Sequence, residues 1–182
     1  LLGEAQTRLD RVVEHTFSLS AGLVVLAQVD GDISPERFAR HVEAMQSERP
    51  QVRNVVAAPD NVVRLVYPLK GNEKVMGLDY RSVPAQWAQV ERARGQRERL
   101  IFAPVKLVQG GLGVIQRSPV FVNRPGAGRG QEHYWGTVSL VADLERFIDM
   151  AGLARTTLDV GLWQRRTNGA PGDLIWGKAD LA

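Results

Sequence analysis

The N-terminal residues, up to the turn at Asp30-Gly31-Asp32, repeat apolar side chains at alternating spacings of three and four. This pattern predicts a long helix with a continuous apolar stripe. The residues at the two repeating positions are Leu2, Ala5, Leu9, Val12, Thr16, Leu19, Leu23 and Leu26. Other apolar residues make the stripe wider than a two-stranded coiled coil requires, so we expect much of it to pack on the helix's own domain. A partner helix along the rest of the stripe stays a second possibility, and the two interpretations are compatible.

No membrane or targeting segment is evident in the sequence. The nearest apolar run, residues 19–29, is shorter than the about 18–20 residues that a membrane span needs, and polar or small residues interrupt it. Glu4 and Asp10 stand where a signal peptide would be basic. Since the chain starts with Leu1 rather than Met, we expect it to be a piece of a longer protein, with any signal or anchor outside it.

Composition excludes several classes of site. The 182 residues carry 23 Lys and Arg against 20 Asp and Glu, a formal net charge of +3, and this length allows one domain or one domain plus a fragment. There is no cysteine, which excludes disulfides, a thiol nucleophile and cysteine-ligated zinc or iron–sulfur sites. His15, His41 and His133 have no carboxylate or hydroxyl partner at a catalytic spacing. We therefore expect no catalytic residues, no metal site and no cofactor in this chain.

Two further motifs favour structural over functional interpretations. Residues 110–113 (GGLG) lie between predicted strands rather than between a strand and a helix, so a hairpin turn explains them better than a dinucleotide site. Glycines alternate with arginines over residues 123–131, which we interpret as a mobile surface loop rather than a phosphate cradle. The arginines of residues 92–99 are interrupted by Glu91 and Glu98, so we expect a solvated helix face and no nucleic-acid partner.

After the first helix, Ser34-Pro35-Glu36 begins a second one, with Ser as the N-cap and Pro in the first turn. The hydrophobic period then changes to that of strands. We predict a hairpin over residues 52–57 and 62–67, a short helical turn after Asn72, and a helix over residues 84–95. Further strands are predicted over residues 100–108, 114–122 and 134–143, followed by a helix over residues 144–153.

This order of elements predicts the α+β class: a long N-terminal helix and an antiparallel sheet with covering helices. We expect three parts: residues 1–50 with the first two helices, residues 51–153 with the sheet, and residues 154–182 as the start of a second, smaller α/β subdomain. A turn at Asn168-Gly169 and a strand at residues 174–176 belong to this last part, which cannot form a stable domain alone.

Short helices between strands of a small sheet commonly leave a cavity beneath them, and such pockets are apolar with a few fixed polar groups. The candidate ligand-binding residues are Tyr67, Leu69, Lys70, Asn72, Leu78, Phe102, Val105, Leu107, Arg117, Phe121 and Trp135. An ordinary hydrophobic core made of the same residues stays open as the alternative.

Several segments resemble the CHASE family of extracytoplasmic sensor domains. They are residues 55–60 (VVAAPD), 63–69 (VRLVYPL), 71–73 (GNE), 77–79 (GLD), 92–95 (RARG), 104–113 (PVKLVQGGLG), 117–122 (RSPVFV) and, more dispersed, 134–144. The resemblance implies a long helix carrying two PAS-like subdomains between two membrane spans, with the ligand in the membrane-distal one. Plant relatives bind adenine-type cytokinins through an Asp, but Lys70 aligns near that position and Phe102 near a smaller polar one, so this specificity does not carry over.

We therefore expect the periplasmic ligand-sensing domain of a bacterial inner-membrane signalling protein, forming a homodimer through its N-terminal helix. The resemblance implies a cytoplasmic output module, either a diguanylate cyclase (GGDEF), a cyclic-di-GMP phosphodiesterase (EAL) or a histidine kinase, so the parent would be an enzyme and this domain would not. The alternative is an interaction module that dimerises without binding a small molecule. The volume and polarity of the distal cavity discriminate between the two.

Overall fold

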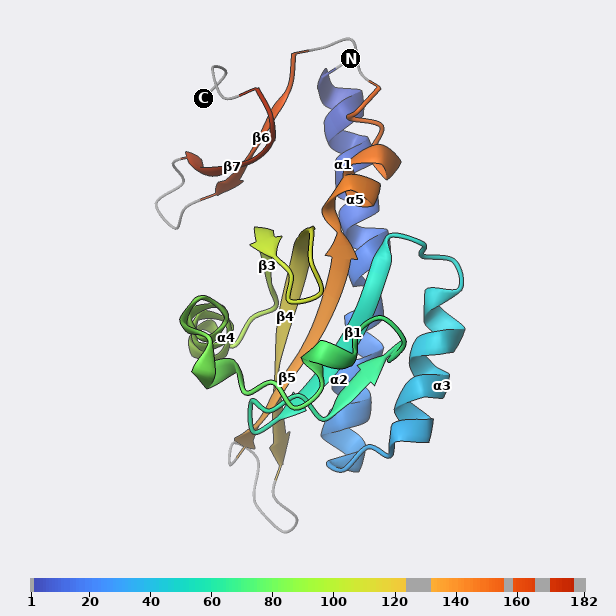
Figure 1. The fold of residues 1–182 in the computed structure, drawn as a ribbon, viewed down its shortest axis with the longest axis vertical. Coiled ribbons are helices and arrows are strands. Elements are labelled where there is room, and N and C mark those ends of the chain that lie inside the picture. Colours follow the sequence, from blue (N-terminus) through green and yellow to red (C-terminus); the bar gives the residue numbers. More distant parts are fainter. Residues whose placement is uncertain (1, 124–131, 156–158, 166–170, 179–182) are drawn as a thin grey trace.

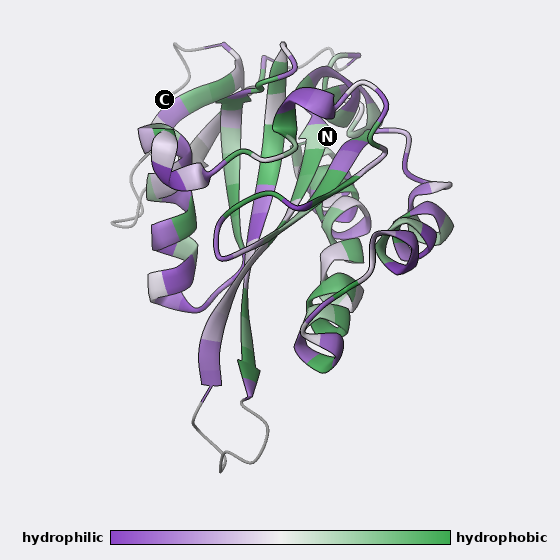
Figure 2. Ribbon diagram, turned by 60° about the horizontal axis from the view of Figure 1, so that its bottom comes forward, coloured by the Kyte–Doolittle hydropathy of each residue, from purple (hydrophilic) through white to green (hydrophobic). Residues whose placement is uncertain are grey.

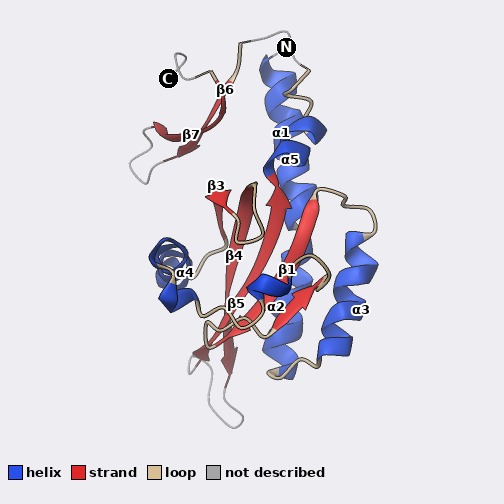
Figure 3. Cartoon of the chain, viewed as in Figure 1, coloured by secondary structure: helices blue, strands red, loops and turns tan. Residues whose placement is uncertain are grey.

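The computed structural model describes residues 2–123, 132–155, 159–165 and 171–178. A five-stranded antiparallel sheet in the order β2-β1-β5-β4-β3 forms the centre, and helices cover both of its faces (Figure 1). The helices are α1 (Leu2–Phe17), α2 (Leu19–Asp30), α3 (Pro35–Gln46), α4 (Pro84–Gln96), α5 (Leu144–Met150) and the short 3-10 turns η1 (Glu73–Val75) and η2 (Tyr80–Ser82). The strands are β1 (Val52–Pro59), β2 (Leu65–Tyr67), β3 (Leu100–Lys106), β4 (Leu112–Asn123) and β5 (Glu132–Asp143), with β6 (Gly161–Arg165) and β7 (Pro171–Gly177) in a separate hairpin. The α+β prediction is confirmed (Figure 3).

The predicted single N-terminal helix is divided into α1 and α2 at Ser18. The hydroxyls of Ser18 and Ser20 donate to the carbonyls of His15 (3.3 Å) and Phe17 (2.9 Å). Such local side-chain bonds compete with the helical hydrogen bonds of the backbone. Gly31 ends α2 with φ +64°, as the predicted Asp-Gly turn requires.

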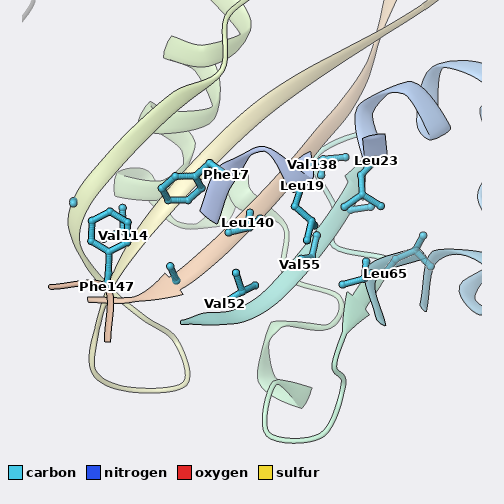
Figure 4. Packing of buried hydrophobic residues seen from close by; sticks show 14 of the residues in the cluster. Phe17, Leu19, Leu23, Val52, Val55, Leu65, Val114, Val138, Leu140 and Phe147 are labelled. Atoms are coloured by element: carbon cyan, nitrogen blue, oxygen red, sulfur yellow. The ribbon is translucent and has the colours of Figure 1, made fainter. Parts of the chain in front are cut away.

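The apolar stripe of this helix packs on the sheet of its own chain. Leu19 and Leu23 are buried against Val55, Val138 and Leu140 (Figure 4). We call α1 and α2 together the N-terminal rod. The aromatic rings of Phe17 and Phe147 lie 6.2 Å apart, which joins this rod to α5. The first of the two interpretations of the stripe is therefore confirmed for α2, whereas Leu2 at the start of α1 is 70% exposed.

The helical segment Leu2–Asp30 is also long and apolar enough to cross a membrane, with a mean hydropathy of 1.4 over its most apolar window. No other segment of the described residues meets the same criteria. The apolar run of residues 19–29 is too short to predict this property, because the whole segment Leu2–Asp30 contributes to it. Because α2 supplies buried residues to the main core, the segment is also accounted for as a core helix.

Successive residues of the central strands point to opposite faces of the sheet. Val55 and Ala57 of β1 join the core under α2, whereas Val56 and Ala58 join a second cluster under α4 and η1. Figure 2 shows apolar residues concentrated in these strands, with polar positions between them. We call the two sides the helix face, covered by α2 and α3, and the α4 face, covered by α4, η1 and η2.

At Gly136 of β5, φ is +148° and an added Cβ would lie 2.2 Å from the carbonyl oxygen of Ala58, so β1 leaves no space for a side chain there. The register between β4 and β5 shifts beside this glycine, between Val120 and Phe121. The shift leaves Trp135 on the helix face, where its Nε1 donates to the carbonyl of Gly31 at 2.5 Å.

The C-terminal hairpin of β6 and β7 confirms that new strands begin after the predicted sheet domain. Leu162, Ile175 and Trp176 pack against the edge of the main core. The loop predicted around residues 124–131 and the turn predicted at Asn168-Gly169 lie outside the described residues.

Candidate functional site

The candidate site is a narrow cleft of about 30 Å³ on the α4 face, open to solvent on one side. Its floor is the central sheet, and its walls come from η1, η2, α4 and the turn between β3 and β4. The lining residues are Asn54, Val56, Val75, Leu78, Tyr80, Gln86, Leu107, Val108, Gln109, Ile115, Arg117 and Val141. The lining is therefore mainly apolar with a few polar groups, which is the usual composition of a small-molecule site.

Arg117 of β4 is the charged residue of this lining and is only 1% exposed. Its Nη1 donates to Oγ of Ser139 at 2.8 Å and its Nη2 to Oε1 of Gln86 at 2.7 Å, with Oε1 of Gln89 more distant at 3.5 Å. Its Nε is buried without a hydrogen-bond partner among the described residues. All the hydrogen-bond acceptors of this guanidinium among the described residues are thus neutral oxygens.

Tyr80 forms a second support for this guanidinium, whose central carbon lies 4.5 Å from the centre of the tyrosine ring. Asp79 begins the η2 turn that positions Tyr80, and its carboxylate accepts from the backbone N–H of Arg81 at 2.9 Å. The Arg81 side chain also donates to Asp79 at 2.8 Å, and these hydrogen bonds lower the pKa of the Asp79 carboxyl. A short polar turn therefore fixes the aromatic side of the cleft.

An amide network closes the opposite end. Asn54 of β1 donates through Nδ2 to Oδ1 of Asn72 at 2.6 Å, and Nε2 of Gln109 donates to the same oxygen at 2.9 Å. Asn72 in turn donates to the carbonyl of Pro68 at 2.8 Å. Arg53 of β1 also holds the β3–β4 turn, because its Nη1 donates to the carbonyl of Gly110 at 2.8 Å. Oδ1 of Asn54 is left buried without a partner among the described residues.

Leu107 reaches into the cleft because residue 113 has no side chain. A Cβ added at Gly113 would lie 2.7 Å from Cδ2 of Leu107 and 3.0 Å from the carbonyl of Ala142. The predicted hairpin turn over residues 110–113 is confirmed, with the N–H of Leu107 donating to the carbonyl of Gly111 at 3.1 Å.

The structure brings six of the sequence-predicted residues together at or beside this cleft. Leu78, Leu107 and Arg117 line it, and Asn72 bonds to two of its lining amides. Val105 packs with Leu107 in the cluster that forms one wall. Phe102 pairs with Ile115 across β3 and β4, so it shares the same face of the sheet.

The other five predicted residues lie elsewhere. Tyr67 and Trp135 belong to the helix face, and Leu69 and Lys70 are exposed. Phe121 lies beyond the register shift, against the Tyr134 ring at 5.6 Å.

Tyr134 lies on the α4 face, where its hydroxyl donates to Oδ1 of Asn61 at 2.7 Å. The Arg94 guanidinium stacks on the Tyr134 ring at 4.6 Å, so a helix position expected to point to solvent instead covers an aromatic residue. Burial raises the pKa of Tyr134 to about 12.

Sequence reasoning missed nine of the twelve lining residues: the polar Asn54, Tyr80, Gln86 and Gln109 and the apolar Val56, Val75, Val108, Ile115 and Val141. Asn54 could have been identified from the sequence. Asparagine is depleted in strands, so an amide inside the β-branched run of residues 52–57 is unusual. The η2 turn that positions Tyr80 depends on tertiary contacts, including the hydrogen bond from the N–H of Tyr80 to the carbonyl of Asn61.

A larger hollow of about 620 Å³ lies between the α2–α3 turn and the ends of β1 and β5, and Trp135 lines it. None of its lining residues carries one of the buried, unpartnered polar atoms found among the described residues. The described residues also hold no group of three His, Asp or Glu side chains that could bind a metal ion. The smaller cleft is therefore the stronger candidate for selective binding.

Comparisons with known proteins agree with this fold. A family model described as the CHASE domain matches residues 32–175. An extracellular ligand binding receptor from Desulfohalobium retbaense DSM5692 has a similar structure, with a TM-score of 0.70 and 17% identity over 99% of this chain and 30% of its own. The ligand-binding domain of the amino acid chemoreceptor PctC of Pseudomonas aeruginosa PAO1, solved in complex with GABA, has a TM-score of 0.65 and 14% identity over 97% of this chain and 72% of its own. No curated protein sequence matches the chain.

Proposed function

This chain belongs to the CHASE domain family of extracytoplasmic sensor domains, and we propose that it senses a small molecule outside the cytoplasm for a signalling protein of the inner membrane. The cleft on the α4 face is the proposed ligand site, with Leu78, Leu107 and Arg117 in its lining and Asn72, Phe102 and Val105 beside it. The sheet domain over residues 51–153 is the proposed membrane-distal sensing unit, and residues 154–182 begin the proximal one.

One observation carries this proposal: two residues that line the cleft, Arg117 and Asn54, each have a buried polar atom without a partner among the described residues, Nε of Arg117 and Oδ1 of Asn54. A chain that used this region only as a core would pair such atoms or replace them with apolar groups, because unpaired buried polar groups cost stability. The alternative of an interaction module with a solid core does not explain why two of the four such atoms among the described residues belong to residues that line one cleft.

Side chains along β5 point alternately to the two faces of the sheet, so this strand connects the cleft with the N-terminal rod. Ser139 accepts from Arg117 on the α4 face, and the next residue, Leu140, is fully buried in the cluster that includes Leu19 and Leu23 of α2. A ligand that moves Ser139 therefore moves Leu140 against α2. Its effect is limited to the difference in its affinity for the two arrangements.

The rod is also the proposed dimer contact. Val25 and Val29 of α2 are exposed, the latter by 76%, although Leu19, Leu23 and Leu26 of the same helix are buried. A parallel homodimer through these residues would place two rods side by side. The chain spans 30% of the length of the Desulfohalobium receptor, and we propose that its parent carries a cyclase, phosphodiesterase or histidine kinase module in the cytoplasm.

Thermal-shift screening of the purified chain against purines, amino acids and small carboxylates tests the ligand site. A compound that binds only the folded state raises the melting temperature. We expect Leu78→Trp, which fills the mouth of the cleft, to abolish the shift. Met76→Trp is the matched control, because Met76 is exposed in the same loop and does not line the cleft. A shift that survives equally in Leu78→Trp, or no shift with any compound, would contradict the proposal.

A further inference from the structure

We infer that the ligand of this cleft is a small monocarboxylate with a hydrogen-bond donor elsewhere in the molecule: its carboxylate binds Arg117 and its donor binds Asn54. The inference rests on the proposed function of the cleft and adds the chemical class of the ligand.

The charge at Arg117 is the first argument. Within the described part of the chain no acidic side chain forms an ion pair with it, and its three hydrogen-bond acceptors are neutral hydroxyl and amide oxygens. Burying a charge without a counter-ion is costly, and buried arginines are usually paired with carboxylates. The free Nε–H adds an unused donor to this uncompensated charge. A carboxylate supplies both the negative charge and the acceptor oxygens that the guanidinium lacks.

The orientation of the amide network is the second argument. Oδ1 of Asn72 accepts from both Asn54 and Gln109, while its Nδ2 donates to a backbone carbonyl, so each group of Asn72 has an assigned role. Asn54 must then use its Nδ2 on Asn72, which leaves its oxygen as the unpaired atom. The complement of that oxygen is an N–H or O–H donor on the ligand.

The spacing of the two residues limits the size of the ligand. Asn54 pairs with Val141 and Arg117 pairs with Ser139 on the same strand, so the two residues are two strands apart and offset by two residues. From the usual dimensions of a sheet, their Cα atoms are about 12 Å apart. The side chains of both residues occupy much of that span, which leaves room for a molecule of a few heavy atoms.

The rest of the lining argues against a doubly charged anion. Apolar side chains from three strands and the η1–η2 segment fill most of the cleft wall: Val56, Val75, Leu78, Ile115 and Val141. Arg117 is the sole charged residue among the lining residues. One guanidinium balances one carboxylate, whereas phosphate or a dicarboxylate would bring a second charge into an apolar site.

Binding assays with matched pairs of compounds test the inference. The probes are 4-aminobutyrate, the L-amino acids and lactate, each beside its primary amide, together with phosphate, sulfate and the purines. We expect a carboxylate to raise the melting temperature and to bind at least tenfold more tightly than its amide. Arg117→Met should weaken that carboxylate at least tenfold, and Asn54→Ala should weaken it less. Arg94→Met is the matched control, because this arginine lies on the same face but outside the lining, and it should bind within twofold of the wild type.

The outcomes separate this inference from the proposed function. A neutral compound, or phosphate or sulfate, that binds best and is lost in Leu78→Trp would overturn the carboxylate but keep the cleft as the sensor site. Binding of the carboxylate within threefold of the wild type in a folded Arg117→Met protein would also overturn it. Failure of every probe to raise the melting temperature would overturn both. Circular dichroism and the melting temperature without ligand establish that each variant is folded.

Discussion

The two faces of the central sheet are built by the same strands but packed in different ways. On the helix face, residues from α1, α2, α3, α5 and all five strands of the sheet form one continuous apolar cluster. On the α4 face the apolar residues separate into two smaller clusters, one around Val56 and Tyr80 and one around Leu107 and Ile115. Arg117 and Asn54 lie among the residues that line the cleft between them.

The helix face therefore contributes mainly stability, and the α4 face contributes mainly selectivity. An apolar cluster gains stability from buried area whatever its detailed composition. Buried polar groups add little net stability but specify which molecule fits against them. Since residues alternate along each strand, Ser139 can serve the cleft while its neighbour Leu140 serves the core.

The largest expected effect compares two Leu→Ala substitutions. Leu140→Ala on the helix face removes a side chain with no exposed surface and should lower the free energy of unfolding by about 2–5 kcal/mol. Leu107→Ala in the cleft should cost less than about 2 kcal/mol, because the space that it leaves is continuous with a site already open to solvent. Urea unfolding measures both values, and equal losses would remove the distinction between the faces.

A double-mutant cycle across Arg117 and Ser139 should give a smaller effect. Ser139→Ala leaves Nη1 of the buried guanidinium without its acceptor and should cost about 1–3 kcal/mol. Arg117→Met removes a buried charge that has no acidic partner, so its stability should lie within about 1 kcal/mol of the wild type or above it. Adding Ser139→Ala to Arg117→Met should then cost almost nothing. A loss of several kcal/mol in Arg117→Met alone would mean that the arginine is a structural residue.

The smallest effect is expected at alkaline pH. Burial raises the pKa of Tyr134 on the α4 face to about 12, above its value of 10.0 in the unfolded chain. The folded state therefore holds this proton more tightly, and its contribution is complete below pH 10.0 and is lost as the pH rises toward about 12. Tyr67 on the helix face also has a raised pKa, chiefly through burial, so Tyr134→Phe should flatten the decline without abolishing it. Unfolding curves at several pH values measure the slope, and an unchanged slope in Tyr134→Phe would refute this assignment.

Much of the fold could be predicted because it depends on local patterns. The Ser34-Pro35 helix start, the change of period after Pro50 and the order of the strands are all written in neighbouring residues. The cap is present as expected, with Oγ of Ser34 accepting from the N–H of Arg37 at 3.3 Å. The division at Ser18 was not predictable from the apolar spacing, because that spacing continues through it.

The site could be predicted only in part, because the face to which a residue points depends on register. Tyr67 and Val66 are neighbours in the sequence, yet one packs on the helix face and the other on the α4 face. Trp135 reaches the helix face through a register shift that no local pattern signals. Arg117, which was predicted among the pocket residues from the arrangement of the strands, does line the cleft.

The smallest residue near the cleft governs its shape from outside the lining. Gly113 does not itself border the space, but any side chain there would collide with Leu107 and push it toward a different position. A mutational scan restricted to the walls would therefore overlook the position at which a single methyl group could remodel the entrance. We therefore expect substitutions at Gly113 to change the size of the ligand that the cleft accepts, although every residue that lines the cleft stays the same.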